Sequence, residues 1–263
     1  MQVIASGVVD AYYFSCLTAM NGRKQLKLGA SMTQKKLWIV LGLLFTACAG
    51  ASNAYADDSD NFAGVGASVD VGYYHADFSY PNNTNYRADV HYYGMVFVQP
   101  VSPDVGFGLL AGYQTTGVDN PSLNPLGDGF GPFAGFFIEW QPELNDYWNL
   151  DLRAGYTWHD MSYTNNNQQP YQQADLTWYT TYVFLGPKLH YGPWRFSVGG
   201  YYQTVSGTEN DNGTLNQTLD FSAAHTTGAY IGFDYYLNHT QSFGIYATSG
   251  AIQSVSLSFK VQF

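Results

Sequence analysis

Histidine and aspartate residues recur at two-residue spacing between positions 75 and 91. His75 is followed by Asp77, and Asp89 is followed by His91. An antiparallel hairpin that pairs His75 with His91 and Asp77 with Asp89 would bring two imidazoles and two carboxylates to one face. These are ligand types suited to zinc, copper or nickel. The spacing therefore predicts a candidate metal site, and the alternative is a hydrated rim with titrating histidines.

Charged residues form a second candidate group, because four acids and four bases fall on the polar side of an alternating pattern. They are Asp70, Glu139, Asp151, Asp234, Arg153, Lys188, Arg195 and Lys260. Charges removed from water are costly unless they are paired. The balance therefore predicts an interior crossed by salt bridges and hydrogen bonds. It favours a structural polar core over a charged constriction that selects ions.

Apolar and polar residues alternate along most of the chain after residue 62. From Trp148 to Trp158 every second residue is apolar, and the residues between them include Asp151 and Arg153. A period of two indicates β-strands with one apolar face. The composition agrees, because 23 tyrosines and 17 phenylalanines accompany only 11% charged residues, which favours strands over helices. We therefore predict an all-β fold.

Two features favour a membrane barrel over a soluble sandwich. Trp148 and Trp158 stand at the two ends of one apolar face, and short turns alternate with longer polar loops. We predict a closed antiparallel up-and-down transmembrane β-barrel of ten strands, with eight strands as the alternative. The alternation in the first strand would point His75 and Asp77 outward. The expected strands are 62–78, 89–99, 105–115, 130–140, 147–159, 175–190, 194–206, 225–237, 242–248 and 253–263.

The amino-terminal part of the chain has the features of a secretory leader. Two lysines precede a short apolar core, and a small-residue cleavage site ends at Ala56. We predict a signal peptide over 32–56, an upstream extension over 1–31 outside the fold, and a barrel over 57–263; Met1 and Met32 are both candidate starts. Removing 1–56 removes both cysteines and leaves an acidic chain, so nucleic acid is excluded as a partner.

The carboxy-terminal strand resembles the terminal strand of bacterial outer-membrane β-barrel proteins. Its apolar face carries Leu257, Phe259 and Val261 and ends at the terminal Phe263. The resemblance is to small barrels, OmpA/OmpX-like or omptin-sized, without a subfamily. It implies recognition by the barrel-assembly machinery, a location in the bacterial outer membrane, and contact with outer-membrane lipids and lipopolysaccharide.

Three functions follow from these features. The charge-paired lumen and the polar, acidic external loops favour a monomeric structural or surface-interaction protein without a cofactor, whose loops bind an external protein or surface ligand. The first alternative is a narrow porin-like channel for small solutes. The second is an outer-rim hydrolase, since Asp89-Val90-His91 resembles a short omptin pattern and His225-Thr226-Thr227 resembles the His-x-Ser of lipid A deacylases. The omptin acid pair is not evident, and His225 shares an apolar face, so we expect no enzyme.

Overall fold

A computed structural model describes residues 65–81, 84–118, 128–164, 172–213 and 216–263. The predicted extension over 1–31, the signal peptide over 32–56 and the start of the predicted barrel before residue 65 lie outside these ranges. Across the described ranges, no helix is long and apolar enough to cross a membrane.

The described residues form twelve β-strands, and every paired neighbour is antiparallel. The strands are β1 (Gly66–Ser79), β2 (Asn85–Ser102), β3 (Val105–Val118), β4 (Gly129–Trp140), β5 (Glu143–Asn145), β6 (Trp148–Thr164), β7 (Gln172–Tyr191), β8 (Trp194–Gly213), β9 (Gln217–Ala223), β10 (Thr227–Asn238), β11 (Gln241–Gly250) and β12 (Ile252–Gln262).

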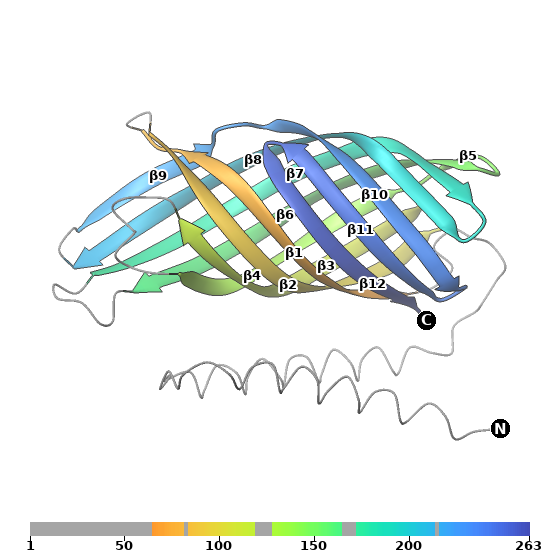
Figure 1. Ribbon diagram of the computed structural model, residues 1–263, viewed down its shortest axis with the longest axis horizontal. Helices are drawn as coiled ribbons and strands as arrows, with labels where there is room; N and C mark the ends of the chain where they lie inside the picture. The colour runs from red at the N-terminus through yellow and green to blue at the C-terminus, as the bar shows by residue number, and fades with distance from the viewer. Residues whose placement is uncertain (1–64, 82–83, 119–127, 165–171, 214–215) are drawn as a thin grey trace, which may run out of the picture. The chain divides into compact units, whose positions relative to one another are not determined.

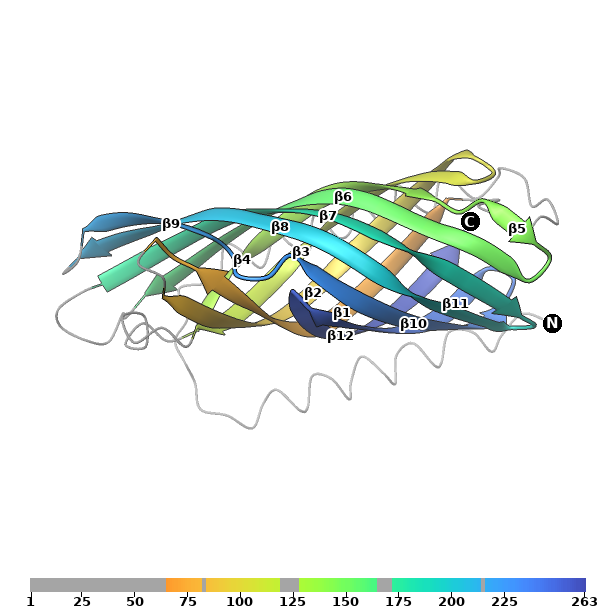
Figure 2. The same cartoon turned by 90° about the horizontal axis from the view of Figure 1, so that it is seen from above.

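Ten of these strands close into a ring. Figures 1 and 2 show the barrel wall that the strands form. The order runs β10-β11-β12-β1-β2-β3-β4-β6-β7-β8, and β8 pairs with β10 to complete it. The predicted ten-stranded up-and-down barrel is therefore confirmed. β5 is a short addition to the turn between β4 and β6.

The strands reach further outward than the sequence pattern predicts. β6, β7 and β8 continue through residues that we expected in loops, and β9 is a strand that we did not predict. The sequence pattern did not predict these extensions or β9, because a strand that has left the membrane has polar side chains on its outward face. In Figure 1 these extensions lie at the end of the barrel marked by β9.

At this outer end the ring contains eight strands instead of ten. β9 pairs with β8 from Ser206↔Ser222 to Asp211↔Gln217 and with β1 at Phe78↔Ala223 and Ser79↔Ser222. The outer ring therefore consists of β1, β2, β3, β4, β6, β7, β8 and β9. Figure 1 shows β10, β11 and β12 confined to the other part of the wall.

The chain between β9 and β10 joins the two rings. The Ala224 N–H donates to the Asp77 carbonyl at 2.9 Å, and the Gln203 N–H donates to the Thr226 carbonyl at 2.7 Å. Below this segment, the turn between β11 and β12 contains Gly250 at a φ of 104°, a conformation that glycine adopts without strain. The Ala251 N–H then donates to the Thr227 carbonyl at 2.9 Å. Backbone hydrogen bonds thus connect the ten-stranded part of the wall to the eight-stranded part.

The outward face of the wall divides at the same step. Around the ten-stranded part it is apolar and exposed, as at Ile138, Val198 and Ile231. Aromatic side chains bound this belt at its two edges: Trp140, Trp148 and Trp194 at one, and Tyr73, Tyr93, Tyr113, Tyr156, Tyr179 and Tyr202 at the other. Beyond the tyrosines most outward residues are polar, and Phe130 on β4 is an exposed apolar exception. We call the part within the belt the membrane storey and the part beyond the tyrosines the outer storey.

Arginine substitutions on the two outward faces should separate the storeys. Ile231→Arg places a charge within the apolar belt and should lower the free energy of unfolding by about 2–4 kcal/mol. Thr208→Arg, on the polar outward face of β8, should change it by less than about 0.5 kcal/mol. Urea titrations of both variants in lipid vesicles measure the difference, and equal costs would contradict the belt assignment.

Candidate functional site inside the barrel

The interior of the outer storey is an apolar core. Side chains from β1, β2, β6, β7, β8 and β9 point inward and are buried together. They are Ala76, Phe78, Ala88, Val90, Met161, Tyr163, Ala174, Leu176, Trp178, Val205 and Phe221, with Tyr80 just after β1. Phe78 links the walls, because its ring centroid lies 4.9 Å from that of Phe221 and 5.9 Å from that of Trp178. The bore is therefore filled by side chains at its outer end.

Two buried acids, Glu209 and Asp211, interrupt this apolar core. Glu209 on β8 is 1% exposed, and its carboxylate accepts a hydrogen bond from the Tyr80 hydroxyl at 2.5 Å. Asp211 follows on the same inward face and accepts from Gln217 Nε2 at 2.8 Å. Glu209 lies outside the membrane storey, where burial raises its pKa to about 7.

The interior of the membrane storey contains charged groups as well as aromatic rings. On β10, β11 and β12, Lys260 Nζ lies 2.8 Å from Asp234 Oδ1, and the Tyr246 hydroxyl donates to the same carboxylate at 2.6 Å. Lys260 also contacts the Tyr246 hydroxyl. Asp234 is 4% exposed, so its charge depends on these two partners.

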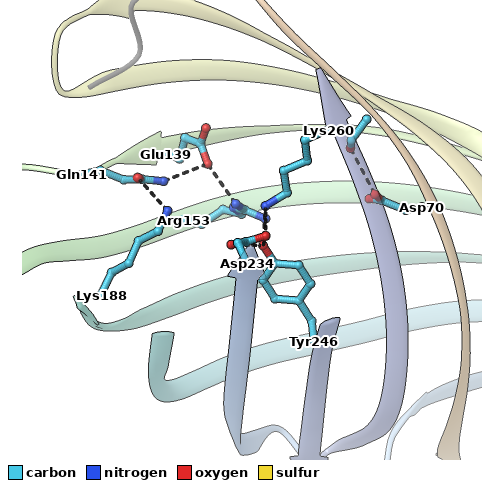
Figure 3. A network of polar contacts seen from close by, with 9 residues as sticks. Asp70, Glu139, Gln141, Arg153, Lys188, Asp234, Tyr246 and Lys260 are labelled. Carbon is cyan, nitrogen blue, oxygen red and sulfur yellow. Dashed lines mark hydrogen bonds and ion pairs between the residues drawn. The ribbon is translucent and has the colours of Figure 1, made fainter. Parts of the chain in front are cut away.

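A second charged group lies on the wall formed by β4, β6 and β7. Arg153 Nη2 lies 2.9 Å from Glu139 Oε2, and the guanidinium stacks 4.9 Å above the centroid of the Phe137 ring. Gln141 donates to Glu139 at 3.4 Å and accepts from Lys188 Nζ at 3.3 Å. Figure 3 shows this group beside the Lys260 and Asp234 pair.

The other predicted interior charges have different surroundings. Asp70 accepts a hydrogen bond from Ser68 at 3.1 Å. Asp151 Oδ1 is buried without a hydrogen-bond partner in the described part of the chain. Arg195 lies apart from the network, because it donates to the Gly192 carbonyl at 2.7 Å and stacks 5.0 Å from the centroid of the Tyr236 ring. It lies at the start of β8, next to the turn between β7 and β8.

The candidate metal residues do not converge, because the β1–β2 register differs from the expected one. The ladder pairs His75 with Asp89, Tyr73 with His91, and Asp77 with Arg87. His75 Nδ1 lies 3.7 Å from Asp89 Oδ1. His91 packs on the ring of Tyr73 at 4.8 Å between centroids, and Asp77 pairs with Arg87 at 3.3 Å. Among the described residues, no group of three or more histidines, cysteines or acids could hold a metal ion.

The carboxy-terminal strand takes part in the apolar belt. Leu257 and Phe259 on β12 point outward and are exposed, and Val69 on β1 lies opposite Phe259. The Phe263 N–H donates to the Val65 carbonyl at 2.9 Å, which extends the ladder beyond Gln262. Recognition of these residues by the assembly machinery stays a prediction.

A cavity of about 500 Å³ extends from Gly66, Thr240 and Gln262 at one end, past the charged network, to the apolar core. Trp178 and Val205 of the core line it, and so do Arg153 and Lys260 of the network. The cavity therefore ends beneath the core. This division into a cavity and a core had no signal in the sequence, because alternation reports which residues face inward and not how the inward residues fill space.

A closed antiparallel ring of ten strands, with an apolar outward belt between two aromatic edges, defines a small outer-membrane β-barrel. The predicted class is therefore confirmed, without a subfamily. The chain is 12% identical to the outer membrane protease OmpT of Escherichia coli, with a TM-score of 0.47, covering 80% of this chain and 99% of that one. It is 8% identical to the translocator domain of the autotransporter NalP of Neisseria meningitidis, with a TM-score of 0.47, covering 90% and 100%.

A third solved structure, the beta domain of the Bordetella autotransporter BrkA, is 12% identical with a TM-score of 0.44, covering 76% of this chain and 100% of that one. No protein-family model and no curated protein matches the sequence.

The buried carboxyl of the outer core generates a pH prediction. Burial raises the folded-state pKa of Glu209 from 4.5 to about 7. The contribution of this carboxyl to the free energy of unfolding is therefore fully present below pH 4.5 and is lost as the pH rises through 7. Glu209→Gln removes the titration and should raise the free energy of unfolding at pH 8 by about 2–3 kcal/mol, with little change at pH 4. Urea titrations in vesicles measure this, with Asp220→Asn on the exposed face of β9 as the matched control. A Glu209→Gln variant that is less stable at pH 8 would contradict the buried acid.

Proposed function

We propose that the chain is a closed, non-conducting outer-membrane barrel whose outer storey acts as a structural or surface-interaction module. The observation that carries this proposal is the apolar core over Phe78, Trp178 and Phe221, which fills the bore of the outer storey. Water and ions do not pass such a core, because an ion that enters it loses its hydration without gaining partners.

The outward face of the outer storey supports the surface role. Its exposed and partly exposed side chains include Asp77, Asp89, Asp160, Asp175 and Asp220, against Arg87 as a base. An acidic surface of this kind favours partners that are basic or that bring divalent cations, such as lipopolysaccharide with bridging ions. We infer that outer-membrane lipids surround the belt and that the assembly machinery engages β12.

The channel and hydrolase alternatives have less support. A narrow channel would use the charged groups around Arg153 and Lys260 as its constriction, but the bore beyond them is filled. For a hydrolase, Asp89 and His91 would have to act from the outward face of β2, where His91 packs on Tyr73. His225 is exposed on the segment between β9 and β10. We therefore propose no catalytic role.

Conductance in planar bilayers tests the closed barrel. The purified protein should show no channel steps, and Arg153→Ala should also be silent, because the outer core stays in place. The double variant Trp178→Ala, Phe221→Ala removes two large rings from the core and should produce steps. Steady wild-type conductance whose size or ion preference changes in Arg153→Ala would contradict the proposal and favour the narrow channel.

A further inference from the structure

A chamber with aromatic walls lies directly beneath the outer core. It has a volume of about 220 Å³ and shares much of its wall with the larger cavity. Its lining contains rings, amides and hydroxyls, including Tyr92, Phe133, Phe184 and Gln203, and no aspartate, glutamate, lysine or arginine. A charged ligand would lose its hydration there without gaining an ionic partner. The lining therefore selects an uncharged molecule.

The rings of the chamber are held in fixed positions. The His159 ring stacks on Trp178 with 4.6 Å between centroids and 4° between planes, and it stacks on Phe133 at 5.9 Å. On the other wall, Phe184 stacks on Tyr201 at 5.0 Å. The Tyr201 hydroxyl donates to the Ile252 carbonyl at 2.9 Å and accepts from the Ile252 N–H at 2.8 Å. Walls that are already ordered lose little entropy when a planar molecule binds between them.

Gln114 supplies a polar group whose hydrogen bonding is incomplete. It is 1% exposed, and its Oε1 lies 3.1 Å from His159 Nδ1. Because a carbonyl oxygen only accepts, His159 Nδ1 is the donor in this bond. The Gln114 Nε2 atom has no hydrogen-bond partner among the described residues. A buried donor in this state is destabilising, and an acceptor beside it would supply the missing bond.

We propose that this chamber binds a small, uncharged aromatic molecule that carries a hydrogen-bond acceptor such as a carbonyl. The volume agrees, because an apolar cavity of about 150 Å³ is enough to hold benzene, and the chamber of about 220 Å³ leaves room for a short substituent. The ring of the ligand lies against the edges of the Phe133 and His159 rings, which stack on each other along the wall, and the acceptor faces Gln114. The ligand reaches the chamber from the periplasmic side, because the core closes the other end.

Fluorine NMR titration of the purified protein in detergent tests the site with two probes of matched shape. 4-Fluoroacetophenone carries the carbonyl, and 1-ethyl-4-fluorobenzene replaces it by a methylene group. We expect saturable binding of one 4-fluoroacetophenone, at least about tenfold tighter than the hydrocarbon, because only the ketone satisfies the buried donor. No saturable binding beyond that of protein-free micelles, or equal affinity for both probes, would overturn the proposal.

Two variants locate the binding. Gln114→Leu should keep the binding of both probes and abolish the tenfold preference. Ser254→Phe, which fills the chamber from β12, should abolish saturable binding. Ketone binding that persists in Ser254→Phe would place the site elsewhere and overturn the proposal. Far-ultraviolet circular dichroism checks that each variant is folded. The preference of the wild-type protein for the ketone over the hydrocarbon tests the proposal even without the two variants. The NMR titration measures binding and not ion conductance, so its outcome is separate from that of the conductance experiment on the closed barrel.

Discussion

Closure of the backbone hydrogen-bond ring is the constraint on which the rest of this structure depends. A strand edge that faces lipid leaves N–H and C=O groups without partners, so a spanning sheet must close on itself. This chain closes twice, once with ten strands in the membrane storey and once with eight in the outer storey. The two closures require a junction, and the hydrogen bonds of Ala224, Gln203 and Ala251 provide it.

The number of strands in turn sets what each storey contains. Eight strands give a bore that side chains just fill, whereas ten leave additional space. In the outer storey, rings from strands that are not neighbours, such as Phe78 on β1 and Trp178 on β7, meet as in a soluble core. In the membrane storey the space that remains is the cavity, and the charges around it are held in pairs such as Arg153 with Glu139 and Lys260 with Asp234. An apolar core in the outer storey and a cavity in the membrane storey thus follow from one change in strand number.

The sequence predicts the class, the ten main strands and the inward face of each, because a period of two follows directly from strand geometry. It places Asp234 and Lys260 on the inward face, but it cannot say that they meet, since their contact depends on the pairing of β10, β11 and β12. The hairpin at His75 shows the same limit. Alternation gives the face of a residue, whereas the partner across the ladder depends on the register that the loop and its neighbours select.

The outer storey is the part that alternation describes least well. Most of its outward residues are polar and most of its inward residues are apolar, which is the pattern of any soluble β-structure. We expected a loop over all of β9 and the outer end of β8. A soluble barrel that continues from a membrane barrel gives no break in the pattern at the membrane surface. The change is visible only in which face is apolar: outward below the tyrosines and inward above them.

Thiol accessibility tests the division of the interior most directly. Leu176 and Thr180 point inward from β7 on either side of Trp178, and the predicted mature chain has no cysteine of its own. A water-soluble maleimide should modify Thr180→Cys in the folded protein, because Thr180 lines the cavity, and should leave Leu176→Cys unmodified until the protein is unfolded. Equal rates at the two positions would show a continuous water-filled bore and would contradict the closed barrel.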